Sequence, residues 1–285
     1  MKNTVYILFF IFFSSTFIES KELNIVVTIL PQKYFVEKIG GNLLNVTVMV
    51  EKGNDPHTYE PKTSKMIALS KADIYFTISL PLEKKWINKM RGSNKKLKVI
   101  PMDKDIEKIF SESYLDNNNE NSLHEDSHTW LSPALVRIMA ENIRDALMKE
   151  DTTHNISYYR NFLNFIKEIN RVDTKIADIF LNSKNDKHMF MVYHPSFSYF
   201  AKSYGLKQIA IEAEGKEPSP KRLISTIKTA KENDIKTIFV EPQFDKKSAR
   251  SIAQSINAKL VEIDPLSYFW EDNLIKFAES IANNE

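Results

Sequence analysis

The sequence predicts an α/β fold of two lobes, each built on a parallel sheet of four strands. Three observations support this prediction: eight short β-rich runs, helical periodicity after them, and near-equal spacing of the runs in the two halves of the chain. The runs begin at positions 24, 45, 74 and 98 and again at 188, 208, 237 and 259, which gives steps of 21, 29 and 24 and then 20, 29 and 22. Such periodicity indicates that one structural unit occurs twice, offset by about 160 residues.

The predicted strands and helices alternate along the chain. The strands are NIVVTI (24–29), NVTVMV (45–50), IYFTI (74–78), KVIPM (98–102), HMFMVYH (188–194), QIAIEA (208–213), TIFVEP (237–242) and KLVEID (259–264). The segment LPQKYFVEKIGG (30–41) corresponds to HPSFSYFAKSYG (194–205), and residues 220–234 have helical periodicity. Strands that alternate with helices form parallel sheets that are covered on both faces. A single sheet of eight strands is the alternative.

Two long helices are predicted between the repeats. The first spans 132–151, with Ser132 at the N-cap and Pro133 at the first helical position. The second, within 154–183, contains no Gly or Pro, and its apolar residues fall at 156, 159, 162, 163, 166, 169, 172, 176, 179 and 180. About 28 helical residues span roughly 42 Å. Because a flexible linker would be rich in Gly, Ser and Pro, this one is expected to be rigid. We therefore expect an N-terminal lobe at 21–153, a linker helix at 154–183 and a C-terminal lobe at 184–285.

The first twenty residues predict export. Lys2 precedes an apolar run at 5–18, which has the length of a signal-peptide core and is short for a membrane span. An uncleaved membrane anchor is the alternative. The chain has no cysteine, so we expect no lipid anchor at that residue, and a protein that is free in the periplasm.

Composition and motifs exclude several functions. The net charge is +2 and both signs are mixed along the chain, so no nucleic-acid-binding surface is expected. The six glycines form neither a P-loop nor a dinucleotide-binding fingerprint, and the G-x-S-x-G and H-E-x-x-H motifs are absent. The absence of cysteine excludes disulfides, thiolate metal sites and a cysteine nucleophile.

The remaining candidates are histidines near strand ends, where α/β folds bind ligands. His57 and His128 follow the second and fourth strands, His194 ends the fifth, and Asp264 ends the eighth. If the lobes face each other, these four side chains meet in one cleft. Three imidazoles and a carboxylate suit a borderline divalent ion, zinc above all. His154, His188 and His124 are weaker candidates, the last because it lies in the polar, acidic segment 111–127.

The internal repeat helps to rank these candidates. Position 194 corresponds to Leu30, so the fold itself does not require His194. Asp264 corresponds to Asp103, so Asp103 is an alternative candidate for the fourth ligand. A purely structural role at a strand end is the alternative for either aspartate. Carboxylates often orient ligating histidines. Glu60, Glu214 and Glu241 are the candidates for that role, with ordinary surface or helix-start charges as the alternative.

The same segments, taken in order, resemble the cluster A-I solute-binding proteins of zinc and manganese ABC transporters. DPHTYEP (55–61), HTWLSP (128–133), YHPSFSYFAKSYGL (193–206) and IDPL (263–266) carry the resemblance, together with EPSPKRL (217–223) and IFVEPQF (238–244). The resemblance covers essentially the whole mature chain. It implies two α/β lobes joined by a rigid helix, a metal held between them by His57, His128, His194 and Asp264, and delivery to a membrane permease.

The resemblance also bears on which metal is bound. Zinc members of the family carry histidine at the third ligand position, as this chain does at His194, whereas many manganese members carry glutamate. The chain departs from the pattern at Ser132, where aspartate is usual, and in segment 111–127, which is acidic rather than histidine-rich. We therefore expect a monomeric, non-enzymatic zinc carrier. A manganese or iron carrier, a zinc hydrolase, and an adhesin with a structural metal remain as alternatives.

Overall fold

The computed structural model describes residues 22–110, 125–183, 188–212 and 218–283. The predicted signal peptide at 1–20, His124, Glu214 and most of segment 111–127 lie outside these residues. The elements of the first half are β1 (Leu23–Val27), α1 (Leu30–Gly40), η1 (Gly41–Leu43), β2 (Leu44–Val48), α2 (Thr63–Ser70), β3 (Ile74–Thr77), α3 (Pro81–Ser93), β4 (Lys98–Pro101), η3 (Thr129–Leu131), α4 (Pro133–Glu150) and η4 (Thr152–His154).

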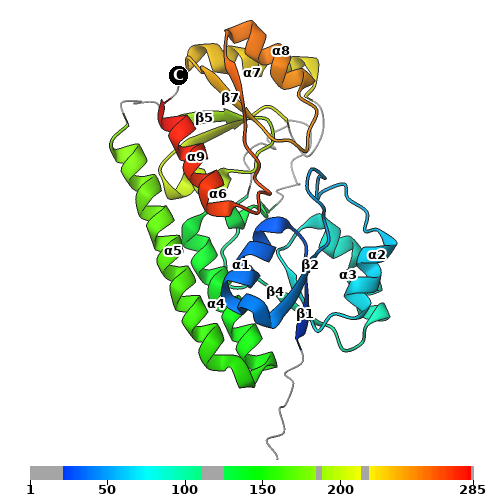
Figure 1. The fold of residues 1–285 in the computed structure, drawn as a ribbon. Helices are drawn as coiled ribbons and strands as arrows, with labels where there is room; N and C mark the ends of the chain where they lie inside the picture. Colours follow the sequence, from blue (N-terminus) through cyan, green and yellow to red (C-terminus); the bar gives the residue numbers. More distant parts are fainter. Residues whose placement is uncertain (1–21, 111–124, 184–187, 213–217, 284–285) are drawn as a thin grey trace, which may run out of the picture.

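The second half repeats this plan after one long helix (Figure 1). Its elements are α5 (Asn155–Leu181), β5 (Met189–Val192), α6 (Ser198–Ser203), β6 (Lys207–Ala210), α7 (Pro220–Glu232), β7 (Thr237–Val240), α8 (Lys247–Ile256), β8 (Lys259–Glu262) and α9 (Trp270–Asn283). The two four-stranded parallel sheets have the orders β2-β1-β3-β4 and β6-β5-β7-β8. The predicted pair of lobes is confirmed, and the alternative of one eight-stranded sheet is wrong.

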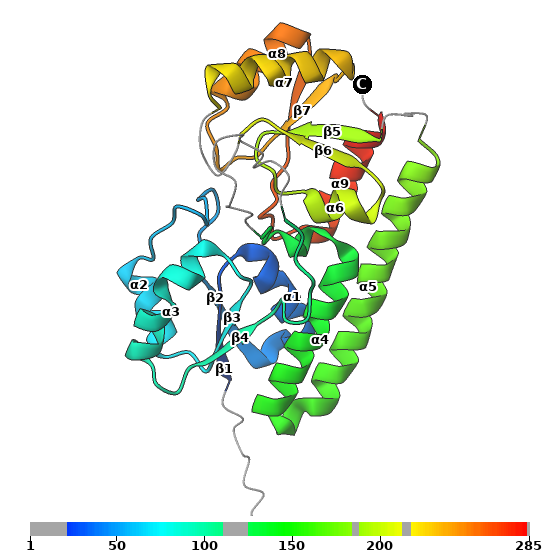
Figure 2. The ribbon, with the colours of Figure 1, turned by 180° about the vertical axis from the view of Figure 1, so that it is seen from behind.

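Both faces of each sheet are buried, because alternate strand residues point to opposite sides. In β1, Ile25 and Val27 pack toward α1, α4 and α5, whereas Val26 packs toward α2 and α3. In the second lobe, Val192 packs into the same core as Ile25 and Val27. Met191, on the opposite face, packs into a separate core with α7 and α8. One continuous apolar core therefore runs through both lobes, along the side on which α5 lies (Figure 2).

Helix α5 joins the lobes as predicted, but its buried face is narrower than the sequence pattern indicated. The residues it buries are Tyr158, Phe162, Phe165, Ile169, Val172 and Ile176. By contrast, Ile156, Tyr159 and Leu163 are exposed, which corrects their assignment to the buried stripe. The helix packs against α4, α1 and α9, and these contacts hold it against both halves of the molecule. The boundaries 21–153, 154–183 and 184–285 stay a prediction.

Helix α4 begins as predicted, except for its cap. Ser132 occupies the N-cap position and Pro133 the first turn, but the Ser132 side chain makes no capping hydrogen bond. Its hydroxyl instead lies 2.8 Å from that of Ser203, at the end of α6. The serine in the HTWLSP segment therefore links the start of α4 to the second lobe.

Candidate metal centre

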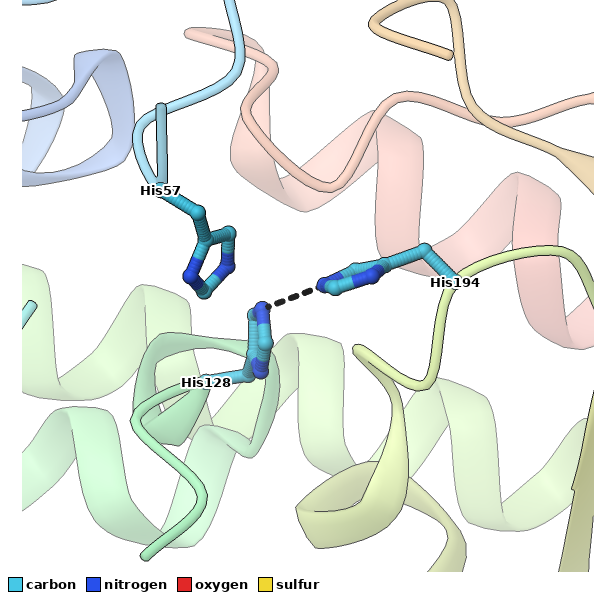
Figure 3. A group of neighbouring side chains, drawn as sticks. All are labelled: His57, His128 and His194. Atoms are coloured by element: carbon cyan, nitrogen blue, oxygen red, sulfur yellow. Dashed lines mark hydrogen bonds between the residues drawn. The ribbon is translucent and has the colours of Figure 1, made fainter. Parts of the chain in front are cut away.

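Three histidine rings from distant segments point toward one centre (Figure 3). His57 lies in the loop after β2, His128 immediately precedes η3, and His194 follows β5 by two residues. One ring nitrogen of each lies within 4.8 Å of those of the other two. The ring centroids are 5.1, 5.2 and 5.7 Å apart. The fold therefore brings together the three histidines that the sequence singled out.

The orientation of His128 is fixed by Asp126. The carboxylate Oδ1 of Asp126 accepts the backbone N–H of His128 at 2.9 Å and lies 2.7 Å from its ring Nδ1. Burial raises the pKa of the Asp126 carboxyl, but the charge and hydrogen bonds of His128 outweigh burial, so the pKa lies below its usual value. When the His128 ring is neutral, an ionised Asp126 holds its hydrogen on Nδ1, so that the lone pair of Nε2 faces the centre.

His194 is held in the same way by the second lobe. Its Nδ1 lies 2.5 Å from Oε1 of the buried Glu212, two residues after β6, and its ring stacks on Phe244 with centroids 4.8 Å apart. Its backbone N–H donates to Glu241 at 3.2 Å. Burial raises the pKa of Glu241 to about 8, so this carboxyl is mostly neutral at pH 7. The Nε2 of His194 lies 3.3 Å from that of His128.

His57 is positioned by its own loop. Oδ1 of Asp55 accepts the backbone N–H of His57 at 2.9 Å, and Oδ2 accepts the hydroxyl of Thr58 at 3.0 Å. These bonds form a local turn of the kind that aspartate favours. Burial lowers the pKa of His57 well below its usual value, and the charges of His194 and His128 lower it further. The ring is therefore neutral at pH 7, as a metal ligand must be.

The rings line a cavity of about 20 Å³ between the lobes. Its lining includes Leu80 and Trp130 from the first half and Phe244 and Leu266 from the second. The cavity has room for a single ion, and three imidazole nitrogens that lie within 4.8 Å of one another face it. The arrangement therefore suits a bare cation rather than an organic substrate.

Asp264, the fourth predicted ligand, does not belong to this close group. Its Oδ1 accepts the side-chain N–H of Gln243 at 2.7 Å and the backbone N–H of Leu266 at 3.0 Å. The following residues, Pro265 and Leu266, line the cavity. Asp264 thus lies next to residues that line the cavity, with one carboxylate oxygen already bonded. Its role as a ligand stays a prediction.

Comparison with known proteins decides the family. Residues 25–284 match the family described as "Zinc-uptake complex component A periplasmic". The chain belongs to this family. A crystal structure of ZnuA superposes with a TM-score of 0.86 at 39% identity, covering 93% of this chain and 100% of that one. The family resemblance seen in the sequence is confirmed.

Two curated relatives differ in the metal that they are named for. The zinc-binding lipoprotein AdcA of Streptococcus pneumoniae is 28% identical over 261 residues, which cover 88% of this chain and 52% of AdcA. The manganese ABC transporter substrate-binding lipoprotein ScaA of Streptococcus gordonii is 27% identical over 295 residues, covering 94% and 92%. This chain thus spans about half the length of AdcA and nearly all of ScaA. Family membership leaves the choice between zinc and manganese open.

No helix in the described part of the chain is both long enough and apolar enough to cross a membrane.

The carboxylates that orient the histidines differ from those expected. Glu60 is exposed and pairs with Lys85, and Glu241 contacts the backbone of His194 rather than its ring. Asp126 and Glu212 hold the rings instead. A signal for Glu212 existed, because it is the next-to-last residue of the strand predicted at 208–213, which pairs with the strand that leads into His194. For Asp126, the signal was its position two residues before His128, from which an aspartate can accept the backbone N–H of that histidine.

The other candidates have local roles. Asp103 is buried and pairs with Lys108. His154 shares Asp151 with Tyr158, since Oδ2 of Asp151 lies 2.6 Å from Nδ1 of His154 and 2.8 Å from the tyrosine hydroxyl. His188 lies exposed at the start of β5. Within the described residues, none of these joins the histidine group.

Proposed function

We propose that this protein captures a zinc ion outside the cytoplasm and delivers it to the membrane permease of an ABC transporter. The observation that carries the proposal is the distance of 3.3 Å between Nε2 of His128 and Nε2 of His194. Two nitrogens that each lie about 2.05 Å from a tetrahedral zinc ion are about 3.35 Å apart. The neighbours of the two rings support the same assignment, because Nδ1 of each ring lies against a carboxylate.

The proposed ligands are His57, His128, His194 and Asp264. Three imidazoles favour zinc over manganese, which prefers oxygen ligands. His57 lies on a loop whose side-chain bonds are local, so we assign metal release to movement of residues 53–61. The long helix α5 and the core shared by both lobes support small lobe movements rather than wide opening.

Two observations favour a carrier over the alternatives. With Asp264 as the proposed fourth ligand, the three imidazoles would fill a tetrahedral shell and leave no position for a catalytic water, which argues against a zinc hydrolase. The apolar cores of the lobes are assembled without the three histidines, which argues against a metal needed only for folding. The zinc-loaded protein should therefore turn over no substrate in an ester and peptide panel. Chelation should leave its far-ultraviolet circular dichroism unchanged.

The test is metal analysis followed by competition. Protein purified without added metal should carry zinc, and excess manganese should fail to displace it. Displacement of zinc by manganese at comparable concentrations would move the assignment to a manganese carrier. Absence of tight binding to either metal would remove the proposed function altogether.

A further inference from the structure

Helix α3 and the turn after it form a strongly basic surface. Six exposed cations belong to residues 81–96, and we call this group the α3 face: Lys84, Lys85, Lys89, Arg91, Lys95 and Lys96. The one acidic residue in this stretch, Glu83, is buried with 4% exposure. The whole chain has a net charge of only +2, so the remainder of the protein is net negative. The overall balance therefore hides a local concentration of positive charge.

Most of these cations are not neutralised by neighbours. Within the α3 face, Lys85 pairs with Glu60. The other five form no ion pair with any carboxylate in the described ranges; they are Lys84, Lys89, Arg91, Lys95 and Lys96. Elsewhere on the same lobe, Lys62 and Lys65 both share Glu51. The α3 face is thus distinguished by unpaired charge as well as by the number of its cations.

One apolar side chain lies among these cations, and another is exposed on the neighbouring helix. Trp86 is half-buried, with Nζ of Lys89 4.6 Å and Nζ of Lys85 6.0 Å from its ring. Ile67 is 52% exposed on α2, which packs beside α3. Both helices lie on the side of the first sheet that faces away from α5 (Figures 1 and 2). Lysines around exposed apolar groups are typical of surfaces that lie against lipid headgroups.

We propose that the α3 face docks the protein on an anionic lipid bilayer. Five of its six cations are lysines, which act as point charges and do not require the bidentate partners that arginine prefers. They spread along a helix and a turn rather than converging on one point, as suits a surface of many phosphates. Each lysine near an anionic membrane contributes about 1 kcal/mol, or about fivefold in affinity. Docking would hold the carrier near a membrane-bound partner.

The test is sedimentation of the exported protein with vesicles of phosphatidylcholine containing about 30% phosphatidylglycerol, at an ionic strength of about 0.1 M. The variant carries Lys84→Gln, Lys89→Gln and Lys95→Gln. The matched control carries Lys149→Gln, Lys167→Gln and Lys175→Gln, which remove the same charge from exposed positions on α4 and α5. We expect the α3-face variant to bind about 100-fold more weakly than the unmodified protein, and the control to bind nearly as well as that protein.

Several outcomes would overturn the proposal. The unmodified protein must bind anionic vesicles and must not bind pure phosphatidylcholine vesicles to the same extent. Equal losses in the two triple variants would mean that net charge, not the α3 face, is responsible. Binding only to vesicles that contain the permease would identify a protein partner instead. Zinc affinity, measured for all three proteins, should be unchanged, which shows that each is folded and separates this result from the proposed zinc function.

Discussion

Nε2 of His128 and Nε2 of His194 lie 3.3 Å apart, although 66 positions separate the two residues in the chain. One belongs to the first lobe and the other to the second, so the pair lies where the lobes meet. Asp126 and Glu212 engage the opposite nitrogens of these rings. If both carboxylates accept a hydrogen from Nδ1, the two Nε2 lone pairs face the same point, and a cation there relieves their repulsion.

This relationship predicts the effect of removing the carboxylates. Glu212→Gln and Asp126→Asn should each weaken zinc binding about 10–100-fold, because they loosen the orientation and basicity of a ligating ring. The affinities can be measured by competition with a chromophoric chelator. Glu60→Gln is the control, since Glu60 is exposed and pairs only with Lys85. Equal effects of all three substitutions would contradict the assigned roles.

The dependence of zinc affinity on pH follows from proton competition. Ligating imidazoles must be neutral, and their reference pKa is about 6.5, so affinity should fall steeply below about pH 6. Burial lowers the pKa of His57, so His57 should be protonated at a lower pH than an exposed histidine. Its contribution to the loss of zinc affinity should therefore appear at that lower pH. Isothermal titration across this range measures the effect. An unchanged affinity between about pH 7 and pH 5 would be inconsistent with three imidazole ligands.

The loop of His57 should control how fast zinc leaves. Asp55→Ala removes the acceptor for the backbone N–H of His57 and for the Thr58 hydroxyl. A looser turn should hold the ring less firmly, so we expect faster zinc dissociation with little change in the free energy of unfolding. Stopped-flow transfer of zinc to a chelator gives the rate. An unchanged dissociation rate would exclude residues 53–61 as the release element.

Trp130 links the segment after His128 to the segment after Asp264 in the second lobe. Its Nε1 donates to the carbonyl of Pro265 at 2.8 Å, and Nε1 of Trp270 donates to the carbonyl of Trp130 at 2.7 Å. Trp130→Phe leaves the buried Pro265 carbonyl without this donor and should lower the free energy of unfolding by about 1–3 kcal/mol. Denaturant titration measures the change.

Trp86→Phe provides the control for this substitution. Nε1 of Trp86 has no hydrogen-bond partner among the described residues, so its removal breaks no hydrogen bond. If Trp86→Phe destabilised the protein as much as Trp130→Phe, the loss would reflect ring size rather than the bond between the lobes.

Much of the fold could be predicted because its signals are local. The spacing of the β-rich runs reflects a repeated unit, and the two sheets indeed have matching strand orders. The long helix was readable from the absence of Gly and Pro. The width of the face that this helix buries could not be predicted, because Ile156 and Leu163 are exposed although they are as apolar as the residues that are buried. Which apolar side chains are covered depends on the neighbouring helices.

The candidate site was predictable only where the fold dictates position. Strand ends led to His57, His128 and His194, which the fold brings together. Spacing could not show which carboxylates would reach the rings, since Glu212 and Glu241 both follow strands and only Glu212 contacts the imidazole of His194. That choice depends on side-chain direction, which comes from tertiary packing.

Zinc titration of single histidine variants tests the central claim most directly. His57→Ala, His128→Ala and His194→Ala should each lower zinc affinity by more than about 100-fold, the upper range for a mere orienting partner. His188→Ala, at an exposed position outside the group, should leave it unchanged. Unaltered affinity in any of the three ligand variants would contradict a single ion held by all three rings.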